Sequence, residues 1–279
     1  MRNAIKQAPA LKPRSGIILP DHVSIKLHEQ SGSTVAYTGK LNGTGFSGSF
    51  SISAAPTWVD GGAKPPSSNT TVKGVAAASS HPELLSVLTP PANGGLIFLW
   101  SYYMTAYTNN AGSPSILLQF GNMVSGGDGY RVGVSQGSNH NVIAQFRGVG
   151  EGAASQATAL NNTLSSRQTV QQYIKTTDGA LAAYSAVNGN WSSAGAATTT
   201  GSFSHTAPAG FDGVSLFTNQ TSGPTSGVEN MNRGATDDKI LSDLLIVVDG
   251  TGALLAEMPE IASEHAQYFR EKLWALDNK

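Results

Sequence analysis

The chain has 279 residues, a formal net charge of −1 and no cysteine. The missing cysteines exclude disulfides, thiolate metal sites and cysteine nucleophiles. Charged residues make up only 13% of the chain, so its surface depends on hydroxyl and amide groups, as in extracellular β proteins. No apolar run approaches the roughly 20 residues that span a bilayer, and we expect no membrane partner.

Residues 1–22 are predicted to form an extended basic arm. Three prolines interrupt the first 20 residues, which carry four basic side chains and no acidic one: Arg2, Lys6, Lys12 and Arg14. Basic residues outnumber acids over 1–73 by eight to three, whereas acids outnumber bases over 229–279 by ten to five. Opposite charges at the two ends favour contacts between neighbouring copies. Unrelated solvated surfaces are the alternative.

Runs of β-branched and aromatic residues between Gly- and Pro-rich turns predict one all-β domain over 23–258, with an elaboration at 23–83. The run at 96–104 is apolar on both alternating faces, which predicts a central strand covered on both sides. Many short strands at this spacing indicate an antiparallel jelly-roll β-sandwich. Besides the hairpin described next, strands are expected at 23–29, 34–40, 46–54, 71–76, 84–89, 96–104, 115–120, 129–136, 141–148, 155–163, 211–217 and 239–248.

The most clearly defined element is a hairpin around Asp178-Gly179, a dipeptide that suits a type I′ turn. Folding the chain at this turn gives one apolar face and one amphipathic face, as a half-buried antiparallel sheet requires. The predicted pairs are Val170–Val187, Ile174–Ala183 and Thr176–Leu181 on one face, with Tyr173–Tyr184 and Lys175–Ala182 on the other.

Residues 259–279 are predicted to form a C-terminal α-helix. Pro259 suits its first turn, and three acids lie near its positive end. Side chains that can pack on a partner recur at three- and four-residue spacing, at Ile261, His265, Tyr268, Phe269, Lys272 and Leu276. Because the polar face is acidic, we expect this helix to pack on the sandwich or on a neighbouring subunit, and not on an anionic membrane.

The order of elements resembles that of concanavalin A-like lectin and glucanase sandwiches, especially their laminin-G and pentraxin-like branch. The Asp-Gly hairpin is followed by a short Asn188-Gly189 turn, a strand in 210–217, a Gly-containing loop with a strand in 234–248, and the terminal helix. The resemblance covers about residues 84–258 and implies a concanavalin A-like sandwich that binds carbohydrate. The basic arm, the missing cysteines and the Gly/Ser/Thr-rich strands also resemble tailed-phage virion proteins.

The resemblance does not extend to catalytic carboxylates. Glucanases of this fold class cluster their acids on one strand, whereas the acids before residue 229 are isolated and several precede a turn glycine. The six histidines show no metal-ligand spacing, and no complete Gly-x-Ser-x-Gly motif occurs. We therefore expect no enzyme. A polysaccharide hydrolase or lyase with dispersed acids remains as an alternative.

Calcium is the one cofactor for which the sequence offers ligands, because related lectin and laminin-G folds hold it with loop carboxylates and carbonyls. The candidates are Asp128, which lies in a glycine-rich loop, and the adjacent acids Asp237 and Asp238. So few ligands do not make a site, and a solvated turn explains them. No cofactor is expected, with a bound calcium ion as the alternative.

Carbohydrate binding requires aromatic rings that stack on sugars and polar groups that hold hydroxyls. The candidates lie beside turns and strand ends: Trp191, Asn190, Tyr103, Tyr107, Tyr130 and Arg131. The basic arm contains no interleaved aromatic residues, so specific nucleic-acid binding is not expected.

These features together predict a non-enzymatic structural protein of a phage virion, in the tail, the baseplate or the capsid surface. The sandwich is expected to contact host-surface glycans. The arm and the C-terminal helix are expected to anchor it to other virion proteins and to copies of itself, as a homo-oligomer. Such a protein becomes extracellular after host lysis. The main alternative is a free carbohydrate-binding lectin module.

Overall fold

The computed structural model describes most of the chain after the first 19 residues. The described ranges are 20–28, 31–52, 55–59, 62–64, 74–77, 80–104, 115–121, 123, 127–134, 141–159, 166–204, 213–219, 229–230 and 239–277. The first strand begins at His22, inside the predicted arm. Arm residues 1–19 lie outside the described ranges.

The described elements fall into two large sheets, one small sheet and three helical segments. The larger sheet contains β1 (His22–Ile25), β2 (Thr34–Leu41), β3 (Thr44–Ser51), β4 (Thr57–Val59), β5 (Gly62–Lys64), β7 (Gly95–Met104), β12 (Arg167–Lys175), β13 (Leu181–Val187), β14 (Gly195–Thr199), β18 (Lys239–Leu241) and β19 (Leu244–Asp249). The six-stranded sheet contains β6 (Gly74–Ala77), β8 (Ser115–Gly121), β9 (Gly129–Val134), β10 (Val142–Arg147), β11 (Ser155–Ala159) and β15 (Gly213–Leu216). The remainder are β16 (Thr218–Asn219), β17 (Glu229–Asn230), α1 (Pro82–Leu88), the 3₁₀ turn η1 (Trp191–Ser193) and α2 (Leu254–Asp277).

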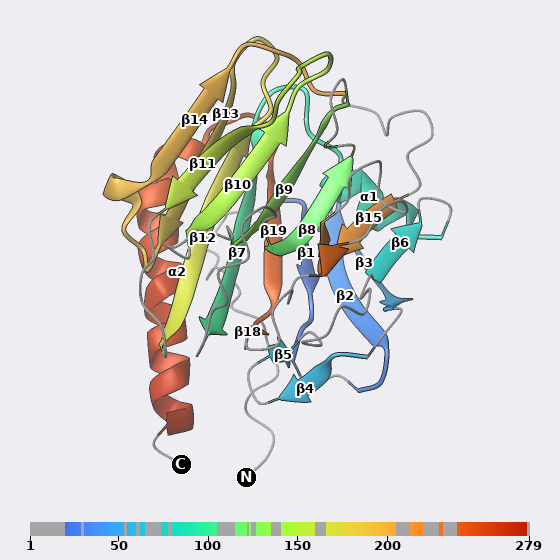
Figure 1. The fold of residues 1–279 in the computed structure, drawn as a ribbon, viewed down its shortest axis with the longest axis vertical. Coiled ribbons are helices and arrows are strands. Elements are labelled where there is room, and N and C mark those ends of the chain that lie inside the picture. The colour runs from blue at the N-terminus through green and yellow to red at the C-terminus, as the bar shows by residue number, and fades with distance from the viewer. Residues whose placement is uncertain are drawn as a thin grey trace.

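The two large sheets stack face to face, with the six-stranded sheet in front in Figure 1. The main path of the larger sheet runs β14-β13-β12-β7-β19-β1-β2-β3, and the other sheet runs β11-β10-β9-β8-β15-β6. All the described strand pairings are antiparallel. This arrangement confirms the predicted antiparallel β-sandwich with a C-terminal helix. Among the described residues, no helix combines the length and apolarity that a membrane crossing needs.

The hairpin around Asp178-Gly179 has the predicted register. Its confirmed pairs are Val170–Val187, Ile174–Ala183, Tyr173–Tyr184 and Lys175–Ala182. Gly179 has a φ of 72°, but Asp178 is not among the residues with a positive φ. The turn is therefore not the predicted type I′, which needs a positive φ at both central residues. Strand β7 contains the apolar run at 96–104 that predicts a central strand. It pairs along its length with β12, so the hairpin is joined directly to this central strand.

The two sheets also meet at their edges. At one edge β14 lies against β11, so close that a Cβ on Gly195 would lie 1.8 Å from the carbonyl oxygen of Thr158. At the opposite edge β3 contacts β6. Only glycine at position 195 allows the two backbones to approach so closely.

The segment 84–89 is expected to be a strand, but residues 84–88 belong to helix α1 and Thr89 is its C-cap. Its four apolar side chains are buried: Leu84, Leu85, Val87 and Leu88. A short apolar run fits a buried helix as well as a buried strand, since its period is ambiguous. Pro82 decides the outcome, because its fixed φ and missing N–H suit the first turn of a helix.

The core lies between the two sheets and is rich in aromatic rings. Tyr130 of β9 is stacked on Phe120 of β8, with ring centroids 5.3 Å apart. Its hydroxyl donates a 2.6 Å hydrogen bond to the carbonyl of Leu88, which ties α1 to the six-stranded sheet. The Trp100 indole N–H donates to Gln172 Oε1 at 3.0 Å, and Gln172 Nε2 donates to the carbonyl of Ile143 at 2.7 Å. The buried amide therefore links the two sheets.

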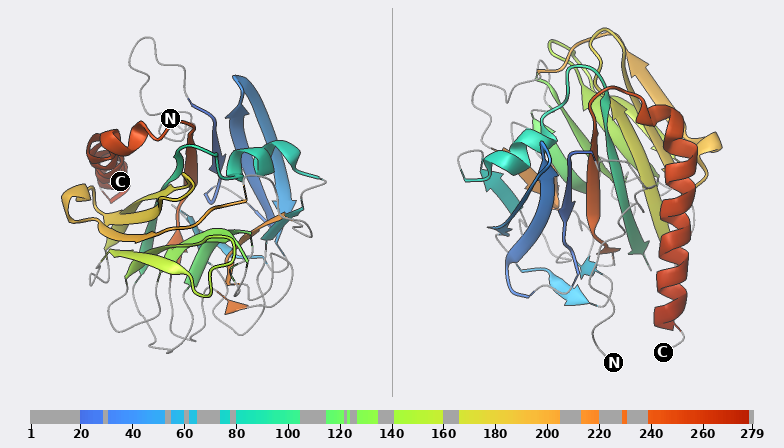
Figure 2. Two further views of the ribbon diagram at one scale, coloured as in Figure 1. Left: turned by 90° about the horizontal axis from the view of Figure 1, so that it is seen from above. Right: turned by 180° about the vertical axis from the view of Figure 1, so that it is seen from behind.

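Helix α2 covers the outer face of the larger sheet, on the side away from the six-stranded sheet (Figure 2). Its apolar face packs on β7, β12 and β19, through a cluster that includes Ile97, Leu99, Tyr173, Val247, Met258 and Ile261. The helix begins at Leu254, five residues before the predicted start at 259. Of the predicted stripe, Ile261 and His265 are buried, and Tyr268 and Phe269 are half-buried.

The early start of α2 follows from the buried carboxylate of Asp249. One of its oxygens accepts the backbone N–H of Leu254 at 2.9 Å, and the other accepts that of Gly252 at 2.8 Å. A carboxylate that satisfies the first N–H groups stabilises a helix terminus both by hydrogen bonding and by its charge. Pro259 is therefore an interior residue of the helix, not its first turn.

Candidate functional site

Polar side chains occupy the outer face of the six-stranded sheet. Along β9, Tyr130 and Val132 point into the core, so the alternation of a strand turns Arg131 outward. The same alternation turns Gln145 outward from β10, between the core residues Ala144 and Phe146. In this part of the sheet, polar side chains therefore lie on the outer face and apolar side chains on the inner face.

The strand register aligns these side chains in one line across the sheet. Gln119 of β8 pairs with Arg131, Arg131 pairs with Gln145, and Gln145 pairs with Gln156 of β11. Ser215 of β15 pairs with Gln119 and extends the line by one strand. We call these five residues the polar row. Neighbouring strands are about 4.8 Å apart, so the row is long enough to contact more than one unit of a polymeric ligand.

Hydrogen bonds connect one half of the polar row. Arg131 Nε donates to Gln145 Oε1, Gln145 Nε2 donates to Gln156 Oε1, and Gln156 Nε2 donates to the Thr158 hydroxyl at 2.9 Å. Arginine is only a donor, so Gln145 must present its oxygen to Arg131 and its nitrogen to Gln156. The orientation of each amide is therefore fixed by Arg131.

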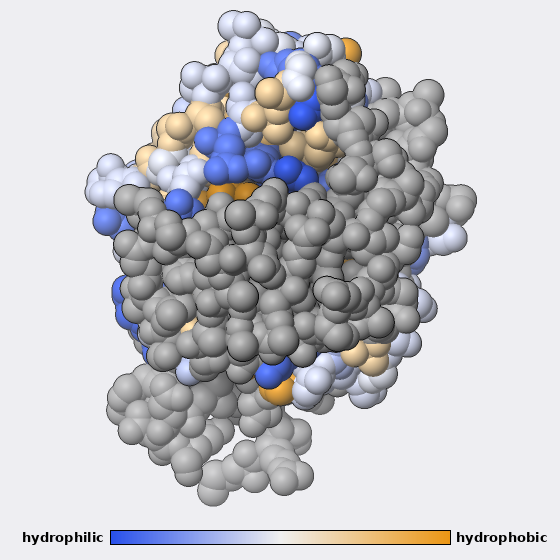
Figure 3. Space-filling view, viewed as in Figure 1, coloured by the Kyte–Doolittle hydropathy of each residue, from blue (hydrophilic) through white to orange (hydrophobic). Residues whose placement is uncertain are grey.

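Exposure increases along the polar row toward β11. Gln119 and Ser215 are buried, Arg131 and Gln145 are half-buried, and Gln156 is exposed. Figure 3 shows hydrophilic residues gathered over the part of the sheet where β10 and β11 lie. The buried end includes the hydroxyl oxygen of Ser215, for which the described residues supply no hydrogen-bond partner. The accessible end of the row is thus made of two amides and one guanidinium.

Of the residues predicted to bind carbohydrate, Arg131 is the one that the structure places in the polar row. Trp191 and Asn190 lie beside helix α2, against the other sheet. The Trp191 ring is half-buried and packs 6.1 Å from the ring of Tyr184. Tyr103 lies near the end of β7, where it pairs with Arg167. Tyr107 lies outside the described residues.

Tyr130 does not reach the surface. Its side chain is 0% exposed, and burial raises the pKa of its phenol well above the ordinary value. The ring fills the space between Phe98 and Phe120. The structure therefore assigns Tyr130 to the core, where its ring is not available to a sugar, while its neighbour Arg131 faces outward.

Of the three calcium candidates, Asp128 alone lies among the described residues. Asp128 is buried, and its carboxylate accepts the backbone N–H of Ser204 at 2.6 Å, as in a loop-stabilising role. Within the described ranges no group of three or more His, Asp or Glu side chains converges in a way that suits a metal ion. Asp237 and Asp238 lie outside those ranges.

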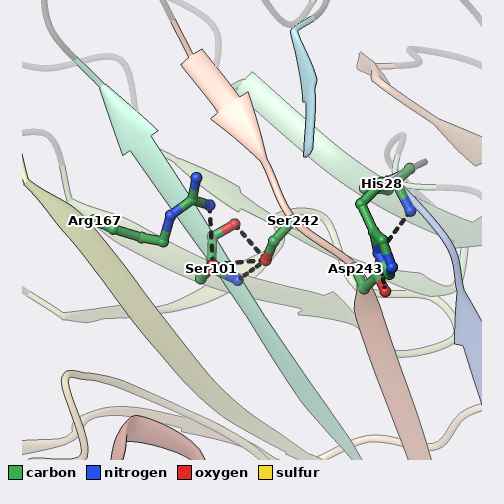
Figure 4. A network of polar contacts seen from close by, with 6 residues as sticks. His28, Ser101, Arg167, Ser242 and Asp243 are labelled. Carbon is green, nitrogen blue, oxygen red and sulfur yellow. Dashed lines mark hydrogen bonds and ion pairs between the residues drawn. The ribbon is translucent and has the colours of Figure 1, made fainter. Parts of the chain in front are cut away.

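A second polar cluster lies in the larger sheet, where β18 and β19 meet (Figure 4). Ser101 and Ser242 are buried with their hydroxyl oxygens 2.6 Å apart, and Arg167 donates to Ser101 Oγ at 3.3 Å. His28 and Asp243 form a separate pair at 2.6 Å. A serine hydrolase needs its serine bonded to such an imidazole, whereas the Ser242 hydroxyl is bonded to Ser101.

This cluster explains why the predicted strand at 239–248 is divided into β18 and β19. The Ser242 side chain accepts the backbone N–H of Ser101 at 2.9 Å, and its own backbone N–H donates to the Ser101 carbonyl. The next residue, Asp243, accepts the backbone N–H of Leu27 at 2.6 Å. Both side chains replace ladder hydrogen bonds at the interruption, so the cluster has a structural role.

The fold and the polar row define this chain as a β-sandwich protein with a hydrogen-bonding outer face. No protein-family model matches it, and no curated protein matches it. Solved structures with which it shares similarity include a heptameric SAP-like pentraxin from Limulus polyphemus, with 12% identity over 82% of this chain and 77% of that one and a TM-score of 0.35.

Two further structures are similar at the same level. The exoplasmic/lumenal domain of VIP36, in a form bound to Ca²⁺ and Man3GlcNAc, is 10% identical over 71% of this chain and 82% of that one, with a TM-score of 0.39. Alginate lyase A1-II′, of polysaccharide lyase family 7, is 11% identical over 82% of this chain and 95% of that one, with a TM-score of 0.35. The function proposed below rests on this chain's own residues.

The three glutamines of the polar row were not among the residues predicted from the sequence. A glutamine in a strand belongs to no motif, and each one alone is an ordinary surface residue. A signal was nevertheless present, because β8 to β11 are consecutive strands in the sequence. Aligning the outward positions of four such strands brings Gln119, Gln145 and Gln156 beside Arg131.

Proposed function

We propose that this sandwich is a non-catalytic glycan-binding protein and that the polar row is its binding surface. The observation that carries the proposal is the line of outward amides and one guanidinium across four adjacent strands, held in fixed orientations by the hydrogen bonds that start at Arg131. Sugars present dense hydroxyl groups, and preoriented amide and guanidinium groups bind hydroxyls without a large loss of side-chain entropy.

The chemistry of the row supports binding and not catalysis. General acid–base catalysis needs a group that gains and loses a proton near the working pH. Amides do not titrate, and arginine stays protonated. The three accessible side chains of the row, Arg131, Gln145 and Gln156, therefore hold a ligand but do not transfer its protons. A hydrolase or lyase is the competing proposal, and release of reducing ends from a panel of polysaccharides would establish it.

The setting we propose is a phage virion. The sequence supports it through the basic arm, the acidic C-terminal segment and the low content of charged residues. In this proposal the arm and α2 attach the sandwich to other virion proteins and to copies of itself, and the polar row faces host-surface glycan. Particles assembled with a variant lacking residues 1–19 test the attachment. Loss of the protein from the particles is the expected result, and its full retention would argue against this anchoring role.

The glycan-binding proposal is tested by screening the protein against immobilised glycans and then measuring affinity for the best one by calorimetry. Gln145→Ala and Gln156→Ala are expected to weaken binding, each by about tenfold, because each removes hydrogen bonds to the ligand. Asn190→Ala is the matched control, since it removes an exposed amide that bonds to Ser192 beside α2. Equal losses in all three variants, or no glycan bound at any concentration, would overturn the proposal.

A further inference from the structure

We infer that the outer face of the larger sheet beside helix α2 is a docking site for the basic N-terminal arm of the same chain. The inference goes beyond the proposed function and does not depend on glycan binding. It rests on an acidic flank of α2, on a buried hydroxyl of β1 and on the place where the arm meets the sheet. In the virion setting proposed above, attachment through the arm requires it to leave this face first.

One flank of helix α2 is acidic and is directed toward β19 and β1. His265 contacts β12, and the next residue, Ala266, lies so close to the turn after β13 that a Cβ on Gly189 would lie 3.0 Å from the Ala266 Cβ. Successive residues of a helix are turned by about 100°, so Glu264 lies on the opposite flank, away from β13. Glu257, about two turns earlier, shares this flank. The sheet order β13-β12-β7-β19-β1 puts β19 and β1 on that side.

The carboxylates of this flank are available to a basic partner. Glu257 and Glu264 are exposed, and neither forms an ion pair with a described residue. Glu260 adds a third carboxylate to the same flank. The strand side of the face is basic, because Lys26 and Lys40 occupy outward positions along β1 and β2. A basic segment on this face is therefore attracted to the helix and repelled by the strands.

The sheet beside this flank contains a buried hydroxyl without a partner. Ser24 of β1 pairs with Leu245 of β19 and with Thr38 of β2, and it faces outward because Val23 and Ile25 lie in the core. Ser24 is only 6% exposed, whereas Thr38 is exposed. The described residues supply no hydrogen-bond partner for the Ser24 hydroxyl. Buried polar atoms are normally paired, and a segment docked over this position has backbone groups to pair with it.

The arm meets the sheet at the edge of this face. The carbonyl of Asp21 accepts the N–H of Val248 at 2.8 Å, so the chain enters β1 next to the end of β19, shortly before the start of α2. Figure 2 shows α2 over one side of the outer face and β1 to β3 on the other. At about 3.3 Å per extended residue, residues 1–19 are long enough to follow the first three turns of α2, which span about 16 Å.

The composition of the arm matches both parts of the face. Residues 17–19, next to the sheet, are apolar and suit the half-buried Leu245, whereas the arm has four basic residues and no acid. Pro13 favours an extended backbone, in which Lys12 and Arg14 share one side. Because the arm is tethered beside the site, its effective concentration is high. The occupant in dilute solution is therefore the arm of the same chain and not that of a neighbour.

The first test is the rate at which trypsin cuts after Arg14 in the full-length protein, followed by mass spectrometry. We expect Glu257→Gln and Glu264→Gln each to speed this cleavage about threefold, because loss of an ion pair raises the population of released arm. Added salt is expected to speed cleavage of the wild type. Glu83→Gln removes an exposed acid of α1 and is the matched control, expected to be cut at the wild-type rate. Thermal unfolding checks that each variant is folded.

The second test is zero-length carbodiimide cross-linking of lysines to carboxylates. We expect Lys6 or Lys12 to be joined to Glu257, Glu260 or Glu264 within one chain, in the monomer band of a denaturing gel. Cross-links found only in a dimer band would assign the site to the arm of a second copy and overturn the inference. Equal cleavage of the wild type and both flank variants, or no cross-link from the arm to α2, would overturn it as well. None of these outcomes affects glycan binding by the polar row, which is measured separately.

Discussion

The Gln171 side chain of β12 donates a hydrogen bond to Nδ1 of His265 in helix α2, with the two nitrogens 2.9 Å apart. The amide orientation is fixed from its other end, where Gln171 Oε1 accepts the backbone N–H of Gly189. His265 must then be neutral, with its proton on Nε2, and burial lowers its pKa to about 3. The His265 imidazole therefore joins the helix to the sheet by accepting a hydrogen bond from Gln171.

This contact predicts that the protein loses stability in mild acid. The pKa of His265 is about 3 in the folded protein and about 6.5 when unfolded, so the unfolded chain binds the proton more readily. The stabilisation is complete above pH 6.5 and is lost progressively as the pH falls toward 3. Urea midpoints at pH 7 and pH 5 measure the loss. His265→Gln is expected to show a smaller difference between the two pH values, and an unchanged difference would contradict this prediction.

Replacement of Asp249 is expected to loosen the start of helix α2. In Asp249→Ala the backbone N–H groups of Gly252 and Leu254 lose their acceptor, and so does the buried hydroxyl of Tyr173, which donates to Asp249 at 2.9 Å. We expect a loss of about 3 kcal/mol, because one buried hydroxyl and two part-buried N–H groups are left without their acceptor. Chemical unfolding gives this value.

The control for Asp249 is Tyr173→Phe, which removes a single hydrogen bond to the same carboxylate. It is expected to cost about 1 kcal/mol and to leave the helix start intact. If the two variants were equally stable, Asp249 would have no special role at the N-terminus of α2.

Trp191→Ala is expected to weaken the packing of helix α2 without affecting a ligand on the polar row. The ring is half-buried against Tyr184 and the cluster beneath the helix, and its loss should cost about 2 kcal/mol. Unfolding measurements and glycan affinity are both needed. Normal stability combined with lost glycan binding would restore Trp191 as a ligand residue and move the binding surface to the opposite sheet.

Tyr130→Phe isolates one buried hydrogen bond. The variant keeps the ring stacked on Phe120 and removes the hydroxyl that donates to the Leu88 carbonyl. The expected cost is about 1 kcal/mol, because a buried acceptor loses its partner. Glycan affinity should stay within experimental error of the wild type. A variant as stable as the wild type would show that water replaces the hydroxyl at this carbonyl.

The parts of the fold that depend on residues close together in the sequence could be predicted. The pairing of Val170 with Val187 and of Tyr173 with Tyr184 follows from one turn, since Asp178-Gly179 sets the register of both strands. The start of α2 could not be predicted in this way. It depends on a carboxylate that is buried at the end of β19, beside β7, whereas the local signal at Pro259 predicts a later boundary.

The candidate site was predicted less well than the fold. Arg131 was found because it follows a glycine-rich loop at the start of a strand. The glutamines beside it, Gln145 and Gln156, have no local feature that marks them, and their shared orientation arises only when four strands are aligned. Sugar stacking favours aromatic residues as candidates, but the Tyr130 ring is buried in the core and the Trp191 ring is half-buried against Tyr184.

The close approach of Gly195 to Thr158 and the contact of β3 with β6 have a consequence for assembly. A free sheet edge offers unpaired N–H and C=O groups to a strand of another molecule and so promotes fibre-like growth. Here the outer strands of the two sheets shield one another at both margins of the sandwich. The two margins formed by β11 with β14 and by β3 with β6 therefore offer little unpaired backbone to a strand of another molecule.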